Sequence, residues 1–85
     1  MFKIKAADGT NNLSGKKITR IRKSKKLSQR KLAEKMQLLG FDVDHYFIRR
    51  VENGERFVTD IDLVIFSRAL EVPISELLSA EDADL

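Results

Sequence analysis

The chain contains no cysteine, a single histidine (His45) and one proline among its 85 residues. The absence of cysteine excludes disulfides, zinc ribbons and thiol nucleophiles. One histidine cannot form a histidine-based metal site without help from carboxylates, and we expect no metal and no cofactor. No apolar run approaches the ~20 residues that span a bilayer, and the N-terminus lacks the apolar stretch of a signal peptide. These absences predict a cytoplasmic protein with no membrane partner.

The low glycine and proline contents also indicate the fold class. One proline and four glycines stand among many Lys, Arg, Glu, Leu and Ile residues, which favours an all-α fold. A chain of this length buries roughly 60% of the surface that its unfolded form exposes, so it has room for one modest core. Its 42% apolar and 34% charged residues are typical of a small globular domain rather than of a disordered chain.

Charge is divided unevenly along the chain. Residues 14–35 carry ten basic side chains and one acidic side chain, a net charge of +9. Residues 59–85 carry one basic and seven acidic side chains, a net charge of −6. A positive face attracts polyanions, although a basic run is also typical of a solvated helix surface. Binding to a membrane surface is excluded, because residues 14–26 offer only Ile18 and Ile21 as apolar residues to bury in lipid.

Helix starts are marked by a recurring spacing, in which an apolar residue precedes a cap and a second apolar residue follows that cap by four positions. The residues at the cap position are Ser14, Ser28, Asp44, Thr59 and Pro73. The pattern predicts five helices, over residues 14–25, 28–39, 44–53, 59–70 and 73–79. Gly40 and the pair Asn53-Gly54 tolerate left-handed backbone, so they mark the ends of the second and third helices.

Apolar residues within these ranges recur at helical spacing and define a candidate core. The core is expected to contain Ile18, Ile21, Leu32, Ala33, Met36, Leu39, Ile48, Val51, Leu63, Phe66, Ala69, Leu70, Leu77 and Leu78. Before the first helix, apolar and basic residues alternate up to a turn signal at Asp8-Gly9. One such stretch cannot form a sheet by itself, and we expect residues 1–13 to form a short N-terminal arm.

The third helix has a polar outward face. With Ile48 and Val51 directed at the core and 100° per residue, its outward residues are Tyr46, Arg49, Arg50 and Asn53, with His45 on one flank. Arginine can bind O6 and N7 of guanine, and a helix fits the major groove of B-DNA. The alternative is an ordinary surface role, in which His45 is solvated, Tyr46 packs on the second helix and Arg49 pairs with Glu52 or Asn53.

Two segments together resemble a known family. The sequence LSQRKLAEKM at residues 27–36, followed by IRRVENGER at 48–56, is similar to the helix-turn-helix domain of Cro/CI-type repressors, the xenobiotic-response-element group. The resemblance covers residues 14–79. It implies an all-α, five-helix, lambda-repressor-like bundle in which the second and third helices form the helix-turn-helix. The arm at 1–13 then precedes this DNA-binding domain, and an acidic tail at 80–85 follows it.

The resemblance also implies roles for individual residues. The base-reading positions correspond to His45, Tyr46 and Arg50, with Arg49 adjacent. The DNA phosphate-binding positions are expected to be Ser28, Gln29, Arg30, Asn53 and Arg56. This sequence departs from the family at Gln37–Phe41, which adds about five residues before the third helix. We expect these residues to lengthen the second helix and to add Leu38, Leu39 and Phe41 to the core, while the tilt of the third helix stays open.

The favoured function is sequence-specific binding of double-stranded DNA as a transcriptional regulator, with a repressor as the expected type. A homodimer on DNA is expected, with Ile74, Leu77 and Leu78 at the interface on the acidic half. The alternative is a protein-interaction module, such as an antitoxin whose acidic half binds a partner protein. We do not expect an enzyme, because the carboxylates lack a nearby His or Cys and the glycines form no phosphate loop.

Overall fold

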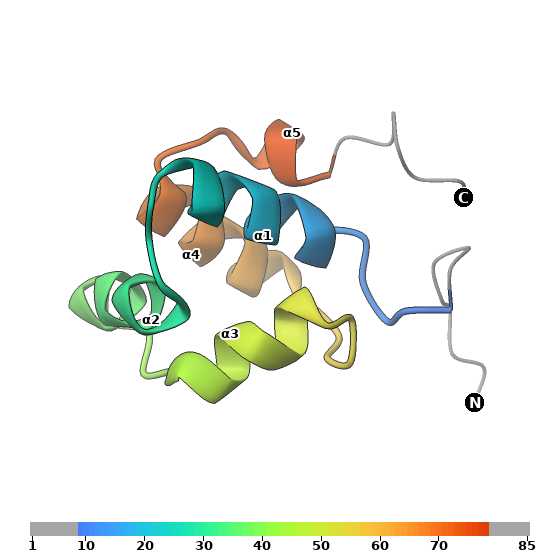
Figure 1. The fold of residues 1–85 in the computed structure, drawn as a ribbon, viewed down its shortest axis with the longest axis horizontal. Coiled ribbons are helices and arrows are strands. Elements are labelled where there is room, and N and C mark those ends of the chain that lie inside the picture. Colours follow the sequence, from blue (N-terminus) through green and yellow to red (C-terminus); the bar gives the residue numbers. More distant parts are fainter. Residues whose placement is uncertain (1–8, 79–85) are drawn as a thin grey trace.

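The structure is a computed structural model that describes residues 9–78, and these residues form five α-helices and no strand. The helices are α1 (Gly15–Ser24), α2 (Gln29–Leu38), α3 (His45–Glu52), α4 (Asp60–Leu70) and α5 (Ile74–Leu77). Figure 1 shows α1 and α4 side by side, with α2 and α3 below them and α5 above. The predicted all-α bundle and the order of its five helices are confirmed. The fifth helix ends at Leu77, two residues before its predicted end at 79. Residues 1–8 of the predicted arm and the predicted tail at 80–85 lie outside the described residues.

Three of the predicted caps start their helices as expected. Ser28 Oγ accepts a hydrogen bond from the Lys31 backbone N–H (3.0 Å), and Asp44 Oδ1 accepts one from the Phe47 N–H (3.0 Å). Thr59 and Asp62, the third residue of α4, form a capping box. The Thr59 backbone N–H donates to Asp62 Oδ2, and the Asp62 backbone N–H donates to Thr59 Oγ1.

The predicted cap at Ser14 is wrong. Ser14 has helical backbone angles and makes no capping hydrogen bond with its side chain. Asn12 takes this role instead, because its Oδ1 accepts a hydrogen bond from the Gly15 N–H at 2.7 Å. An asparagine satisfies a free N–H at a helix start as well as a serine does.

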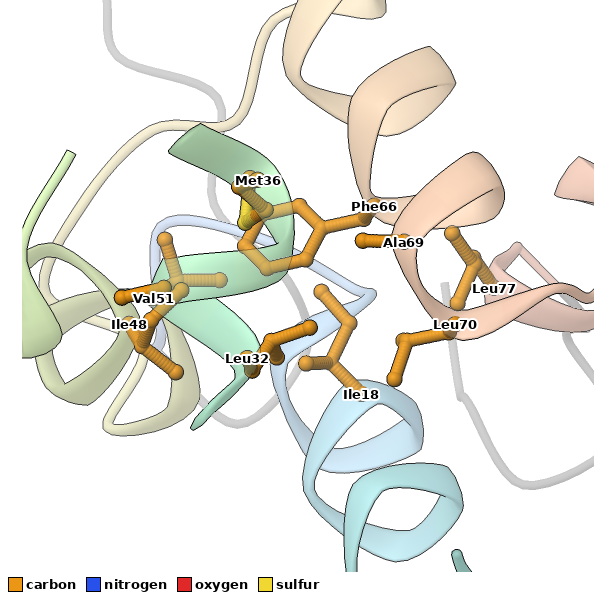
Figure 2. Close-up of a cluster of buried hydrophobic side chains, with 10 residues drawn as sticks. Ile18, Leu32, Met36, Ile48, Val51, Phe66, Ala69, Leu70 and Leu77 are labelled. Atoms are coloured by element: carbon orange, nitrogen blue, oxygen red, sulfur yellow. The ribbon is translucent and has the colours of Figure 1, made fainter. Parts of the chain in front are cut away.

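The core lies where the helices meet, with Phe66 of α4 at its centre (Figure 2). The buried apolar residues are Ile18, Leu32, Ala33, Met36, Ile48, Val51, Phe66, Ala69, Leu70 and Leu77. All ten were expected in the core. Burying one such side chain contributes roughly 1.5–3 kcal/mol, so this cluster is the main stabilising element of the domain.

Gln37 and Leu38 form the last two residues of α2, which ends one residue before its predicted end at 39. The helix ends at Leu38, and Gly40 adopts a left-handed φ of +90° that turns the chain toward α3. The side chain of Leu38 is 87% exposed, and that of Leu39 is also exposed. Leu38 lies 200° around the helix from buried Met36, so it points away from the core. The expectation that Leu38 and Leu39 are core residues is therefore wrong.

Phe41 does pack against the core, at its edge. Its ring meets Phe47 of α3 edge-on, with centroids 5.9 Å apart, and Phe47 stacks on Phe66 at the same distance. Such aromatic pairs contribute about 0.5–1.5 kcal/mol beyond burial alone. The turn before α3 is thus connected to the core through aromatic rings.

Candidate nucleic-acid interface

The outward face of α3 is exposed as the helical spacing predicts. Ile48 and Val51 are fully buried, whereas Tyr46 is 54% exposed and Arg49 and Arg50 are also exposed. His45 is half-buried, and its ring lies 4.1 Å from that of Tyr46, centroid to centroid. The residues expected to read bases therefore occupy one accessible side of α3. Their contacts with bases stay a prediction.

A buried ion pair connects α1 to the end of α3. The Arg22 guanidinium donates from Nε to Glu52 Oε2 (2.6 Å) and from Nη2 to Glu52 Oε1 (3.0 Å). Its Nη1 donates to the carbonyl oxygen of Leu27, just before α2. Both charged side chains are almost completely buried. The pair therefore fixes the ends of α1 and α3 around the start of α2.

Gln29, the first residue of α2, shares this network. Its Nε2 donates to Glu52 Oε1 at 3.0 Å, which orients the side chain at the N-terminus of the helix. The first N–H groups of a helix have no partner within it, and they attract anions. Arg30 is exposed next to Gln29. The structure thus places Ser28, Gln29 and Arg30 together at a helix end that suits a phosphate.

Sequence reasoning missed the role of Arg22. It was counted in the basic run with nine other residues, but Arg22 and Lys17 are both buried, with only 8% exposed. The positive surface is therefore smaller than the charge count indicated. A signal was present, since Arg22 lies four residues after Ile18 and so on the same inward side of α1.

The loop after α3 presents Asn53 and Arg56 close to this helix. Asn53 is exposed, and Gly54 has a left-handed φ of +76°. The Arg56 guanidinium lies over the Phe47 ring, 4.7 Å from its centroid. A cation held over an aromatic face gains about 0.5–1 kcal/mol at an exposed site. Phe47 therefore holds the side chain expected to bind a phosphate.

The residues expected at the dimer interface differ in exposure. Ile74 is 37% exposed and Leu78 is 43% exposed, so both are available to a second copy. Leu77 is fully buried and belongs to the hydrophobic core of its own chain. Leu77 therefore cannot contribute surface to an interface. The expectation that Leu78 lies in the core is wrong, because its side chain is exposed.

Among residues 9–78, no group of three His, Cys, Asp or Glu side chains could hold a metal ion. None of the helices in that same range is long and apolar enough to cross a membrane.

Comparison with known proteins identifies the family. The model of the HTH_3 helix-turn-helix family matches residues 18–77, and the chain belongs to this family. The resemblance to Cro/CI-type helix-turn-helix domains is thereby confirmed. Curated protein sequences gave no match.

Two solved structures have the same fold. The restriction-modification controller protein C.AhdI from Aeromonas hydrophila matches with a TM-score of 0.65 and 30% identity, over 74% of this chain and 84% of that one. An HTH_3 family transcriptional regulator from Vibrio cholerae matches with a TM-score of 0.70 and 22% identity. That match covers 81% of this chain but 36% of the longer Vibrio protein. The lambda-repressor-like bundle is confirmed, and the family supports transcriptional regulation by DNA binding.

Proposed function

We propose that the chain binds a specific double-stranded DNA site as a transcriptional repressor, with α3 in the major groove. The observation that carries the proposal is the exposed outward face of α3 on a helix-turn-helix domain. Base edges in the major groove distinguish all four base pairs. The residues proposed to read them are His45, Tyr46, Arg49 and Arg50.

Contacts with the DNA backbone would come from two groups of residues near the end of α3. The start of α2 offers Ser28, Gln29 and Arg30, and the loop after α3 offers Asn53 and Arg56. Phosphate contacts position a protein on the duplex without reading its sequence. Gln29 binds the carboxylate of Glu52, the last residue of α3, and Asn53 follows Glu52 directly, so both groups would hold the end of α3 against the DNA backbone.

A homodimer would place two copies of α3 on one operator. Ile74 and Leu78 support this arrangement, because they are exposed apolar residues on the acidic half of the chain. Dimeric helix-turn-helix proteins bind half-sites about 34–36 Å apart, which is one turn of DNA. The likeness to a restriction-modification controller protein supports a regulator of this small size.

Selection of bound duplexes from a random DNA library tests the proposal. We expect enrichment of a palindrome with half-site centres about 10 base pairs apart. A gel-shift titration should then give an affinity for the selected site at least ~10³-fold above that for random DNA. Failure to enrich any sequence would contradict the proposal and favour the protein-interaction module.

A further inference from the structure

The segment before α1 is bound to the loop after α3, although the two lie about forty residues apart in the sequence. Three consecutive carbonyl oxygens of the loop accept hydrogen bonds from Asn11 or Asn12. The Gly54 oxygen accepts from the Asn11 backbone N–H (2.8 Å), and the Glu55 oxygen from Asn11 Nδ2 (2.9 Å). The Arg56 oxygen accepts from Asn12 Nδ2 (2.8 Å). We refer to Thr10, Asn11 and Asn12 as the N-terminal clasp.

Asn12 uses every polar atom of its side chain. Its Nδ2 also donates to the carbonyl oxygen of Val51 in α3 (3.1 Å), and its Oδ1 accepts from the Gly15 N–H of α1. One amide group thus connects α1, the last turn of α3 and the loop. Asn11 is less completely bonded, because its Oδ1 is buried without a partner. Asn12 is therefore the stronger of the two connections.

The clasp fits closely against Gly54. A Cβ atom on Gly54 would lie 2.5 Å from the Cβ of Thr10, so only glycine allows the approach. The other side of the loop is fixed by α3 itself. The N–H groups of Gly54 and Glu55 donate to the carbonyl oxygens of Val51 (3.0 Å) and Arg50 (2.9 Å), which is a Schellman motif.

These contacts hold the backbone of the loop in one conformation. The three bonded carbonyl oxygens carry partial negative charge, and the clasp turns them toward its own N–H groups. They are therefore kept from facing a phosphate. The side chains of Asn53 and Arg56 stay exposed, so the loop offers a cation to an anion without first having to be ordered. A preordered loop loses less conformational entropy on binding.

We infer that Asn12 is a positioning residue for DNA binding, because it holds the loop at residues 53–56 in the conformation in which Arg56 meets a phosphate. The inference rests on the proposed function, since it requires that this loop contacts the DNA backbone. Asn12 itself need not touch DNA. Its action passes through the carbonyl oxygens of Val51 and Arg56.

The test is the variant Asn12→Asp. It keeps the acceptor for the Gly15 N–H but replaces the donor by an oxygen that repels two carbonyl oxygens. We expect affinity for specific and random DNA to fall by roughly tenfold alike, and the salt slope of binding to flatten by about one unit. A merely structural role would lower the folded fraction without changing that slope. The variant Asn12→Ala removes both the donor and the acceptor without adding charge, and it should flatten the slope as well.

A double-mutant cycle with Arg56→Ala gives the decisive comparison. Arg56→Ala alone should flatten the salt slope by about one unit, and adding the uncharged Asn12→Ala should then cause little further loss. Wild-type affinity and slope for Asn12→Asp, or losses that simply add in the double variant, would overturn the inference. If the wild-type chain binds no DNA, the proposed function itself fails.

Circular dichroism of each variant shows whether it folds. Should Asn12→Asp not fold, Asn11→Ala supplies the same readout, because it removes the bond to the Glu55 oxygen and keeps the backbone bond to Gly54. We expect a smaller loss of DNA affinity in the same direction. Binding equal to the wild type in Asn11→Ala would overturn the inference in that case.

Discussion

The Arg22 guanidinium binds the Glu52 carboxylate through two hydrogen bonds, with Nε 2.6 Å from Oε2 and Nη2 3.0 Å from Oε1. The pair lies at the junction of α1, α2 and α3, where both side chains are almost completely buried from solvent. A paired arrangement of this kind adds geometric precision as well as attraction, because the planar guanidinium matches the carboxylate. The position of α1 relative to the helix-turn-helix, α2 and α3, therefore depends in part on this one charged contact.

Removal of the cation from this pair should destabilise the fold strongly. Arg22→Met keeps the length of the side chain but leaves Glu52 buried without its partner charge, which costs about 3–5 kcal/mol. The double variant Arg22→Met/Glu52→Leu should lose much less, since no unpaired charge remains. Urea denaturation of both variants measures the free energy of unfolding. A loss below about 1 kcal/mol for Arg22→Met would mean that the pair behaves like an exposed one.

Arg50 should read a base. Arg50→Ala is expected to cost about 1–3 kcal/mol on the selected site and to relax preference at one base pair. The control is Arg68→Ala. It removes another exposed arginine, which lies on α4 in the acidic part of the chain. Gel-shift titration against specific and random duplexes checks both variants. An unchanged ratio of the two affinities in Arg50→Ala would refute the assignment.

The exposed apolar residues of the acidic half should pair two copies of the chain. Ile74→Asp is expected to shift the protein toward monomer in sedimentation at micromolar concentration and to weaken operator binding. Acidic side chains such as Glu71 and Glu76 would repel each other across a two-fold axis, so the wild-type dimer should be firmer at higher salt. Leu77→Ala serves as the comparison. That change empties core volume and should cost about 2–5 kcal/mol of stability.

A monomeric wild type at both low and high salt, together with unchanged operator binding by Ile74→Asp, would contradict the dimer.

Glu71 is the last prediction, and it concerns stability alone. Glu71 ends α4 with a left-handed φ of 58°, which costs a side-chain-bearing residue roughly 1–2 kcal/mol relative to glycine. Replacement of Glu71 by glycine removes this cost, but the greater conformational freedom of glycine in the unfolded chain offsets part of the gain in stability. Glu71→Gly should therefore raise the free energy of unfolding by about 0.5–1 kcal/mol. The control Glu71→Ala removes the charge but keeps the left-handed backbone, and thermal denaturation should show no comparable gain for it.

Helix order and most of the core could be predicted from the sequence, because both depend on local signals. The caps at Ser28, Asp44 and Thr59 are short-range hydrogen bonds within one turn. The apolar spacing that buries Ile48 and Val51 depends only on helical geometry. The outward face of α3 follows from the same geometry, which is why its exposed residues were found without the structure.

Two of the errors concern contacts between segments far apart in the chain, and a third concerns the end of α2. Arg22 and Glu52 are thirty residues apart, and no local pattern connects them. Asn12 caps α1 because its side chain is also held by the loop after α3. The side chain of Ser14, two residues later, therefore makes no capping hydrogen bond. Leu38 and Leu39 look like core residues by hydrophobicity. However, α2 ends there, Gly40 turns the chain toward α3, and both leucine side chains stay exposed.

The division of α3 into two faces has a consequence for how this chain can diversify. Substitution of exposed residues usually changes stability by within about 0.5 kcal/mol, whereas Ile48 and Val51 admit no polar replacement. Tyr46, Arg49 and Arg50 can therefore be exchanged as a set while the rest of the domain stays intact. Under the proposed function, a lineage of this fold can acquire a new DNA target through a few surface changes, with the core inherited unaltered.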